Sequence, residues 1–472
     1  MAVKFISECL QLSGFMQVGF DYGTSNCAMS FMDDGVAKLV PLYGDDAFVP
    51  STLFALDRGF IAELIAQQLQ SASERQAYAQ ARSGALAQAR AGKLEHDLAQ
   101  VSEGLFYGAE AIAHYVAAPE EGYFIKSPKS FLGASGLRPQ MVGFFEDLVA
   151  AMMLNVKQRA EIYLQRDITQ VVIGRPVNFQ GINAQESNRQ AQAILSAAAQ
   201  RIGFRDIEFL FEPLAAGFDF EMRLHENKKV LVVDVGGGTT DCSMVLMGPA
   251  HRNNLQRERD FLGHTGERIG GNDFDILLAQ KALMPSFGML SPLKTGLPMP
   301  LMPFVNAMAI NDIGAQSDFY EANTGFLLEK LQRETTEPEL LKRFVAMRDH
   351  KHNFAVVREA ELGKIALSSA AMHRFPLDFI EQGLAPDINA QSYADIVNLL
   401  LQKIANLIND ATTQAGSLPD VVYITGGSAK SPLIRQLVRE LLGADITIVD
   451  GDHFGSVAAG LGVWSSRIFG TN

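Results

Sequence analysis

The chain has 472 residues, of which 47% are hydrophobic and 20% charged, and its formal net charge is −13. This length exceeds what a single hydrophobic core normally supports, so two or more domains are expected. The acidic balance argues against a general nucleic-acid or anionic-membrane surface, and makes any phosphate site a local feature. Three scattered cysteines and the lack of an apolar run of about 18 residues predict a cytoplasmic protein without disulfides or membrane spans.

Residues 1–15 make a poor secretory signal, because Ser7, Glu8 and Gln11 interrupt their apolar stretch. Met16 immediately precedes the first predicted strand. We therefore expect either that Met16 is the natural start or that residues 1–15 are a loose N-terminal extension.

The first predicted hairpin covers residues 17–31. One apolar run ends at Asp21 and a second begins at Cys27. The turn between them holds Gly23, Thr24, Ser25 and Asn26. A strand, a glycine-containing turn and a returning strand form a tight hairpin whose N–H groups can point at one anion. Taken alone, such a hairpin is more often structural than functional.

Residues 60–100 are rich in Ala, Gln and Arg, which favours helix. They hold few large apolar residues, so we interpret them as a peripheral insertion rather than a deep core helix. The later elements alternate between helix and strand, with helices predicted at 141–165 and 184–202 and strands at 168–174 and 207–211.

Two charged residues stand at element ends. Lys129 lies in a basic turn after a proline, and Glu212 lies where the strand 207–211 passes into the next helix. Each has an ordinary interpretation: Lys129 as a solvated loop residue, and Glu212 as a helix-terminal charge. The functional interpretation places both beside a bound phosphate.

Residues 229–247 repeat the hairpin pattern. A buried β-branched run ends at Asp234, and the returning strand begins at Cys242. The turn holds Gly236, Gly237, Gly238 and Thr239. Three glycines allow positive φ and remove every Cβ that would keep a ligand from the backbone. A carboxylate at this strand end is placed to hold a hydrated Mg²⁺.

The remaining chain contains one stretch without periodicity, residues 284–325, which is rich in Met, Pro and Gly and is interpreted as a lid or partner surface. Helices are predicted at 325–349, 355–370 and 392–414. On the second of these, Glu361, Lys364 and Ser368 share one face by their spacing. Glycine-rich turns occur at Gly271 and, after a strand at 421–425, at Gly426, Gly427, Ser428 and Lys430.

The two hairpins are separated by about 210 residues and share an Asp-x-Gly signature at a strand end. That spacing suggests a duplicated α/β domain with the hairpins facing each other across a cleft. Neither hairpin has the dinucleotide-binding glycine pattern, and no Walker-type motif occurs. The hypothesis is therefore phosphate binding by hairpin backbone.

The ordered motifs resemble the nucleotide-binding domain of the DnaK-type heat-shock chaperones, which belong to the actin and hexokinase-like ATPase superfamily. More narrowly, the chain resembles the bacterial YegD-type putative chaperones. The matching residues are Asp21-Tyr-Gly23-Thr24-Ser25-Asn26, Lys129-Ser-Phe-Leu-Gly133, Glu212-Pro213, Asp234-Val-Gly236-Gly237-Gly238-Thr239, Gly271-Asn-Asp273-Phe-Asp275, Glu361-x-x-Lys364, Leu367-Ser368-Ser369 and Gly426-Gly427-Ser428.

The resemblance implies a two-lobed actin-like ATPase fold, with duplicated ribonuclease-H-like mixed-sheet domains around a nucleotide cleft. Lobe I would cover 16–225, with a peripheral insertion at about 50–134. Lobe II would cover 226–450, with a peripheral subdomain at about 266–384. Residues 451–472 would form a C-terminal helix packing back on lobe I.

The resemblance also assigns roles within an ATP/ADP and Mg²⁺ site. Asp21 and Asp234 would hold Mg²⁺ through water, Lys129 would lie beside the γ-phosphate, and Glu212 would contact the attacking water. The two hairpin turns would hold the β- and γ-phosphates. Adenosine would lie between two walls, the first formed by Gly271, Glu361, Lys364 and Ser368 and the second by Gly426, Gly427, Ser428 and Lys430.

Several features depart from the family pattern. Ile365 stands where an arginine usually lies over the adenine, Lys430 replaces another arginine, and Tyr22 is bulkier than usual. The sequence also ends at Asn472, soon after the last nucleotide motif, so the peptide-binding domain of the chaperones is not expected within it.

The preferred function is a weak Mg-dependent ATPase whose lobes switch with nucleotide state to control a protein partner or client. The alternatives are a small-molecule kinase of the same superfamily and an actin-like filament protein. Metabolite-stimulated ATP turnover would favour the kinase, and ATP-dependent light scattering would favour the filament. No nucleic-acid or membrane partner is expected.

Overall fold

The computed structural model describes residues 16–179, 183–451 and 455–470, so the predicted extension at 1–15 lies outside it. Helices alternate with strands that form several sheets, which confirms the expected mixed α/β class. Within the described ranges, no helix has both the length and the apolar character needed to cross a bilayer.

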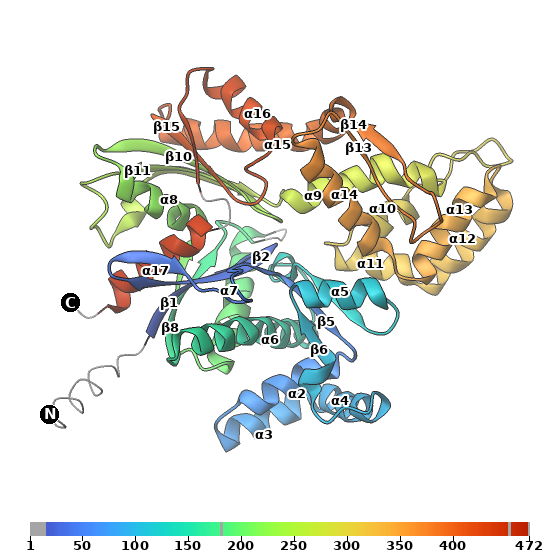
Figure 1. Cartoon of the computed structure of the whole chain (residues 1–472), viewed down its shortest axis with the longest axis horizontal. Coiled ribbons are helices and arrows are strands. Elements are labelled where there is room, and N and C mark those ends of the chain that lie inside the picture. The colour runs from blue at the N-terminus through green and yellow to red at the C-terminus, as the bar shows by residue number, and fades with distance from the viewer. Residues whose placement is uncertain (1–15, 180–182, 452–454, 471–472) are drawn as a thin grey trace.

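The first of two large sheets lies in the lower half of the molecule (Figure 1). Its central strand pairs antiparallel with the strand that follows it in the chain and parallel with the strand on its other side. The order across the sheet is β3 (Val36–Leu39), β2 (Asn26–Asp33), β1 (Met16–Tyr22), β8 (Ile168–Arg175) and β9 (Asp206–Phe211), with the short β4 (Val49–Pro50) on β2.

The second large sheet repeats this arrangement. Its central strand also pairs antiparallel with the next strand in the chain and parallel with a later one. The order is β12 (Phe261–Glu267), β11 (Thr240–Met247), β10 (Lys228–Val235), β15 (Val421–Thr425) and β16 (Ile448–Asp450). We call the parts of the chain built on these sheets the first half and the second half.

Two helices, α8 (Glu212–Arg223) and α17 (Gly455–Phe469), lie between the two sheets. α17 packs on β1 and β2, and α8 packs on β10 and β11. The helices approach closely, since a Cβ atom on Gly460 would lie 1.8 Å from the carbonyl oxygen of Ala215. Trp464 stacks on Phe218 at a centroid distance of 5.4 Å and so packs between the helices.

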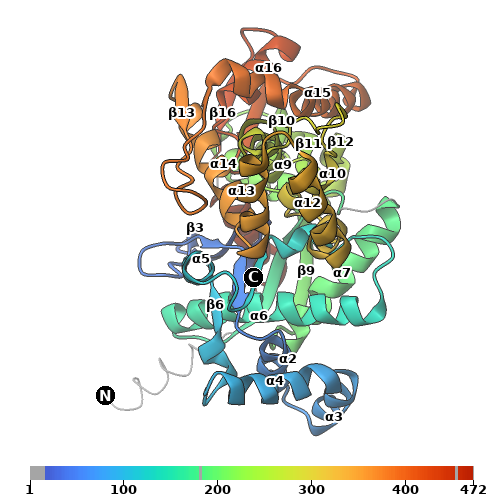
Figure 2. The same cartoon turned by 90° about the vertical axis from the view of Figure 1, so that its right-hand side faces the viewer.

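The outer faces of both sheets are also covered by helices, which explains why the central strands are apolar throughout. α6 (Pro139–Leu164) and α7 (Ala184–Arg201) cover the first sheet. α15 (Ala390–Ala415) and α16 (Pro432–Leu442) cover the second. The sheets and helices therefore alternate in stacked layers, which leaves the turns at one end of each sheet to face the other half (Figures 1 and 2).

The first half also carries a peripheral part, built on a three-stranded sheet. The expectation that residues 60–100 lack a deep core helix is wrong for α2, because Phe60, Ile61 and Ile65 are fully buried and α2 packs on α6. α3 and α4 are largely exposed. The elements are β5 (Thr52–Ala55), α2 (Gly59–Gln68), α3 (Ala72–Ala81), α4 (Ser83–Glu95), η1 (Val101–Gly104), β6 (Leu105–Tyr107), α5 (Ala109–Ala117), β7 (Tyr123–Lys126) and η2 (Pro128–Phe131).

The peripheral part of the second half is helical and includes the aperiodic stretch at 284–325. Met284, Phe287, Phe304, Met308 and Phe319 of this stretch are fully buried in the largest core cluster, so its apolar residues mainly build core. The elements are η3 (Arg257–Asp260), which precedes β12, then α9 (Gly271–Leu278), η4 (Ala279–Leu283), η5 (Met284–Phe287), α10 (Met302–Met308), α11 (Ile313–Tyr320), α12 (Ala322–Glu334), α13 (Pro338–Asp349), α14 (Asn353–Leu367), β13 (Met372–Arg374) and β14 (Asp387–Asn389).

Candidate phosphate-binding site

Both predicted hairpins are present. β1 and β2 pair in antiparallel register, with Tyr22 opposite Cys27. β10 and β11 pair with Asp234 opposite Asp241. In the second turn, the N–H of Gly236 donates to the carbonyl of the residue that ends the turn, at 2.9 Å. Strand pairing therefore places an aspartate at the base of each turn.

The tips of the two hairpins lie against each other. A Cβ atom on Gly237 would lie 2.0 Å from the Ser25 Oγ, and one on Gly238 would lie 2.9 Å from the Thr24 Cγ2. None of the three turn glycines has a positive φ, so that part of the reason given for them from sequence is wrong. At Gly237 and Gly238, the close approach of the first hairpin requires glycine.

Each tip is anchored by neighbouring backbone and hydroxyl groups. The Ser51 Oγ donates to the carbonyl of Gly23 at 2.6 Å, and the N–H of Ser51 donates to the carbonyl of Ser25 at 2.8 Å. The N–H of Gly271 donates to the carbonyl of Gly236 at 2.9 Å. Because the carbonyls are occupied by these bonds, the turns are held in place before any ligand binds. Asn26 begins β2 opposite Pro50.

Lys129 and Glu212 meet beside the hairpin tips. Lys129 lies on η2, Glu212 is the first residue of α8, and the Lys129 Nζ donates to the Glu212 Oε1. Burial opposes the charged form of the lysine, but the carboxylates of Glu212 and Asp21 outweigh it and raise the pKa of Lys129. The lysine therefore remains a cation in a buried, acidic site.

Three aspartates share this site with the Lys129–Glu212 pair. Burial, together with the charge of Glu212, raises the pKa of Asp21 to about 8 and the pKa of Asp241 to about 7. The pKa of Asp234 is raised well above its ordinary value for the same reasons. Lys129 and the nearby Arg175 are fewer than the carboxylates that surround them, so the site favours an added cation.

Asp241 was missed as a site residue from sequence. Its carboxylate accepts a 3.0 Å hydrogen bond from the N–H of Val177, which follows β8 in the first half. Its position directly opposite Asp234 in the predicted hairpin was the available signal, because a two-stranded register brings such pairs together.

The oxygen-rich donor set suits a hard divalent cation such as Mg²⁺. Within the described ranges, no group of three or more His, Cys, Asp or Glu side chains is arranged as a direct metal site. Cation binding by Asp21 and Asp234 through water stays a prediction.

The residues predicted for the adenosine wall converge in part. The Lys364 Nζ donates to the carbonyl of Gly271 at 3.2 Å and pairs with Asp275 at 2.7 Å. The Ser428 Oγ lies 2.7 Å from the position of a Cβ on Gly271. Ser368 donates instead to the backbone of its own helix, at 3.2 Å from the Lys364 carbonyl oxygen.

Glu361 lies on the same helix but is bound to charged neighbours, with Lys126 of the first half at 3.3 Å and Arg358 at 2.7 Å. Burial raises its pKa, but these cations outweigh burial and lower the pKa of Glu361 to about 2. On the opposite side, Gly426 has φ +89°, and a Cβ there would lie 2.5 Å from the Asp234 Oδ1. Gly427 and Lys430 are exposed in the same turn.

Two departures from the family pattern can be located. The Tyr22 side chain is fully buried and its hydroxyl donates to the Met152 Sδ at 3.6 Å, so its bulk lies in the core of the first half. Ile365 is 59% exposed on α14 beside the adenosine residues. Only the second departure leaves an altered surface where a base is expected.

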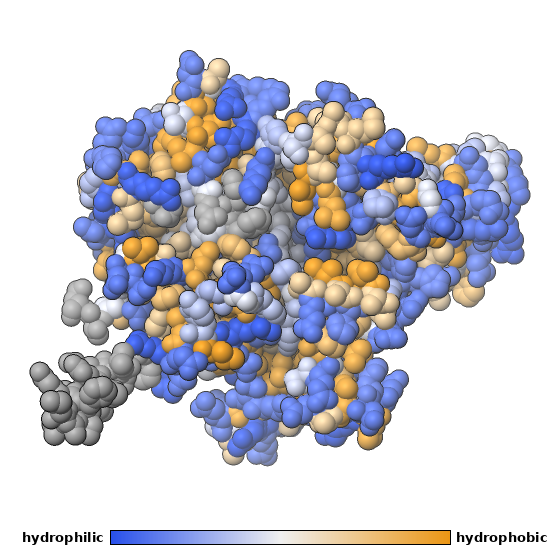
Figure 3. All heavy atoms as spheres, viewed as in Figure 1, coloured by the Kyte–Doolittle hydropathy of each residue, from blue (hydrophilic) through white to orange (hydrophobic). Residues whose placement is uncertain are grey.

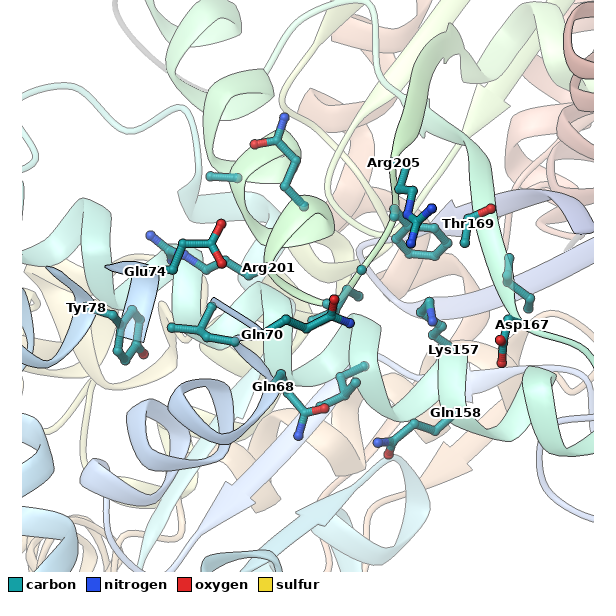
Figure 4. A pocket seen from close by; sticks show the side chains of 18 of the residues that line it. Gln68, Gln70, Glu74, Tyr78, Lys157, Gln158, Asp167, Thr169, Arg201 and Arg205 are labelled. Carbon is teal, nitrogen blue, oxygen red and sulfur yellow. The ribbon is translucent and has the colours of Figure 1, made fainter. Parts of the chain in front are cut away.

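A polar cavity of about 900 Å³ lies elsewhere, between α3, α6 and α7 (Figure 4). Its Lys157 pairs with Glu161, and its Arg201 pairs with Asp147 at 2.9 Å and Glu146 at 2.6 Å. None of the predicted nucleotide residues lines it, so it is not part of the candidate site.

Comparison with known proteins finds relatives among the Hsp70-type chaperones. A family model described as Hsp70 protein matches residues 141–287. The chain is 26% identical over 310 residues to a chaperone protein dnaK of Gracilaria tenuistipitata var. liui, covering 64% of this chain and 39% of that protein. It is 26% identical over 333 residues to heat shock 70 kDa protein 13 of Homo sapiens, covering 66% and 62%.

The protein of the same description from Pongo abelii is 24% identical over 465 residues, covering 92% of this chain and 85% of that protein. Against the dnaK relative and the human protein, the chain spans less than two thirds of the relative's length. The matched segment contains Glu212, the second hairpin and Gly271, which the structure brings together. These matches support the chain as a member of the DnaK-type Hsp70 family.

Proposed function

We propose that the chain binds Mg·ATP between its two hairpins and hydrolyses it slowly, as a nucleotide-switched, chaperone-like ATPase. The observation that carries the proposal is the direct approach of Gly237 to Ser25, with Lys129 and Glu212 paired beside them. In this proposal the two halves are duplicated ribonuclease-H-like lobes of an actin-like fold. The common strand order of the two large sheets supports that relationship.

The turn residues would hold the β- and γ-phosphates through backbone N–H groups, because successive N–H groups in a turn can form an anion-binding concavity. Lys129 would balance charge on the γ-phosphate, and Glu212 would orient the attacking water. The bound Mg²⁺ would neutralise phosphate charge when present. Asp21 and Asp234 would hold it through water, and Asp241 would add a third carboxylate.

Two observations bear on whether these groups fit a cation and a phosphate. Burial and neighbouring carboxylates raise the pKa values of Asp21 and Asp234, so this part of the site favours an added cation. In addition, the Ser130 Oγ is buried and has no hydrogen-bond partner among the described residues. It lies beside the second hairpin turn, 3.0 Å from the position that a Cβ on Gly238 would take. An incoming phosphate oxygen would supply the missing acceptor.

Adenosine would lie between α14 and the turn at 426–430. Lys364 and Ser428 would contact it, while Ile365 would offer an apolar edge in place of a stacking cation. The cytoplasmic location, the control of a protein partner and the closer relationship to the YegD-type proteins belong to the same proposal.

Contacts between the halves provide a means of switching. Asn272 donates to the Ser127 Oγ at 3.3 Å, and Lys126 pairs with Glu361 at 3.3 Å. Both contacts join the segment that precedes Lys129 to elements of the second half. A change at the phosphates would therefore alter the contacts that hold the halves together.

Isothermal titration of the full chain with ATP, with and without Mg²⁺, tests the proposal. We expect one site, weakened at least about 10-fold without Mg²⁺ or by Asp234→Asn. Asp420→Asn is the matched control, since that carboxylate accepts from the N–H of Lys229 at 2.7 Å near the start of the parallel strand pair. Absence of binding by the wild-type chain, or equal loss in both variants, would refute the assignment.

A further inference from the structure

A second cavity, of about 540 Å³, is lined by residues of both halves. Its walls come from β7, η2 and α6 of the first half, and from α11 and the start of α14 in the second. Two of these elements continue into the candidate site, because η2 carries Lys129 and α14 carries Glu361. In Figure 3, hydrophobic residues border the junction between the halves over α5 and α14.

Aromatic rings from both halves line this cavity. Tyr115 stacks on Phe124 at a centroid distance of 4.5 Å, and Phe354 meets Phe124 edge-on at 5.4 Å. The Tyr115 hydroxyl donates to the carbonyl of Lys351 across the junction. Phe145 and Leu148 lie deeper and are buried. Flat apolar walls of this kind are suited to a planar ring system.

The charged residues that line the cavity are mostly basic. They are Arg58, Lys126, Lys351 and Asp312. Asp312 caps α11 by accepting from the N–H of Ala315 at 3.0 Å, which partly satisfies its carboxylate. Lys126 is already paired with Glu361 at 3.3 Å, so Arg58 and Lys351 supply the positive charge that favours an anionic ligand.

We propose that this cavity binds an aromatic small molecule that carries a carboxylate or another anionic group. The rings lie among Tyr115, Phe124 and Phe354, and the anion lies near Lys351 and Arg58. Because the walls belong to both halves, the bound molecule holds the halves together. This last consequence rests on the proposed nucleotide function, whereas binding itself does not.

The experiment uses two fluorescent probes with the same rings, the anionic 1-anilinonaphthalene-8-sulfonate and the uncharged N-phenyl-1-naphthylamine. Titrated into the folded, nucleotide-free full chain, the anionic probe is expected to fill one saturable site and to bind at least about 10-fold more tightly than the uncharged probe. Equal affinities would overturn the anionic ligand class.

The location of the binding site is tested by Ser317→Trp. Ser317 is an exposed residue of α11 that lines the cavity, so a tryptophan there should occupy part of it. Ser73→Trp is the matched control, an exposed serine on α3 outside the cavity. We expect Ser317→Trp to weaken the saturable phase at least about 10-fold and Ser73→Trp to leave it unchanged. Lys351→Ala should weaken only the anionic probe. Unchanged binding to Ser317→Trp would overturn the site.

The coupling is tested by release of radiolabelled ADP with and without saturating anionic probe. Slower release supports closure of the halves, and equal rates overturn it, because a ligand that favours the closed arrangement must alter nucleotide release. If the chain bound no ADP at all, the proposed nucleotide function would fail while the probe titration would still decide the cavity.

Discussion

Removal of the Lys129 ammonium group tests the chemistry assigned to the candidate site. The side chains of Lys129 and Glu212 are 4% and 13% exposed, so their ion pair is largely shielded from water. Lys129→Ala removes the cation that pairs with Glu212, and the partly buried Arg175 then remains as the arginine that interacts with the Glu212 charge. Loss of one group that stabilises developing charge typically lowers kcat by about 10²–10³-fold. We expect ATP turnover to fall by that factor.

The cost to folding should be smaller than for most buried ion pairs. Breaking such a pair typically costs about 3–5 kcal/mol, because it leaves an unpaired buried charge. In this site the pKa of Asp21 is already raised to about 8, so the carboxylates can take up protons instead. We therefore expect a smaller loss of unfolding free energy near pH 6 than near pH 8.

Lys157→Ala is the matched control for this prediction. Lys157 is also a buried lysine paired with a glutamate, and its side chain is 10% exposed, but it lines the polar cavity of Figure 4. Steady-state phosphate release and urea unfolding should separate the two variants. Lys157→Ala should lose stability and keep its turnover. Wild-type turnover in Lys129→Ala, or an equal loss in Lys157→Ala, would refute the assigned role.

Three further changes address the phosphates, the carboxylates and the base. Gly237→Ala places a Cβ atom 2.0 Å from the Ser25 Oγ and should weaken ATP binding by about 10-fold in calorimetry. Gly84→Ala, with open space around it, should have no effect. Equal ATP affinities of the two variants would show that the hairpin tips do not meet. The pKa of Asp21 is about 8 in the folded protein and about 4 in the unfolded chain, so the ligand-free protein should lose stability as pH rises between these values. Asp21→Asn should flatten the dependence of the unfolding free energy on pH, as measured by urea unfolding. An unchanged dependence would contradict the raised pKa. Ile365→Arg adds a cation beside the expected base and should tighten ATP binding by about 2- to 5-fold, and no change would place the base elsewhere.

Local signals predicted the hairpins well. A β-branched run ended by an aspartate and followed by glycines specifies a strand and a tight turn within a few residues, as β10 and β11 show. The reason for the glycines was not predictable in the same way. It depends on Ser25 and Thr24, about 210 residues away, and on how the two halves pack.

Long-range placement also limited the other predictions. Asp241 became part of the site only through strand register and through Val177 of the first half. The stretch at 284–325 showed no periodicity because its helices are short, with seven residues in α10 and eight in α11. Two turns of helix are too few for a hydrophobic repeat to emerge. The tertiary core, which buries Phe304 and Phe319, determines its structure.

A crystal structure of the full chain with a non-hydrolysable ATP analogue and Mg²⁺ tests the central claim most directly. The account predicts the β- and γ-phosphates between the turns at 23–26 and 236–239, with Lys129 beside the γ-phosphate and a hydrated Mg²⁺ near Asp21 and Asp234. Nucleotide bound at another place on the chain, or phosphates that contact only one of the two hairpins, would contradict it.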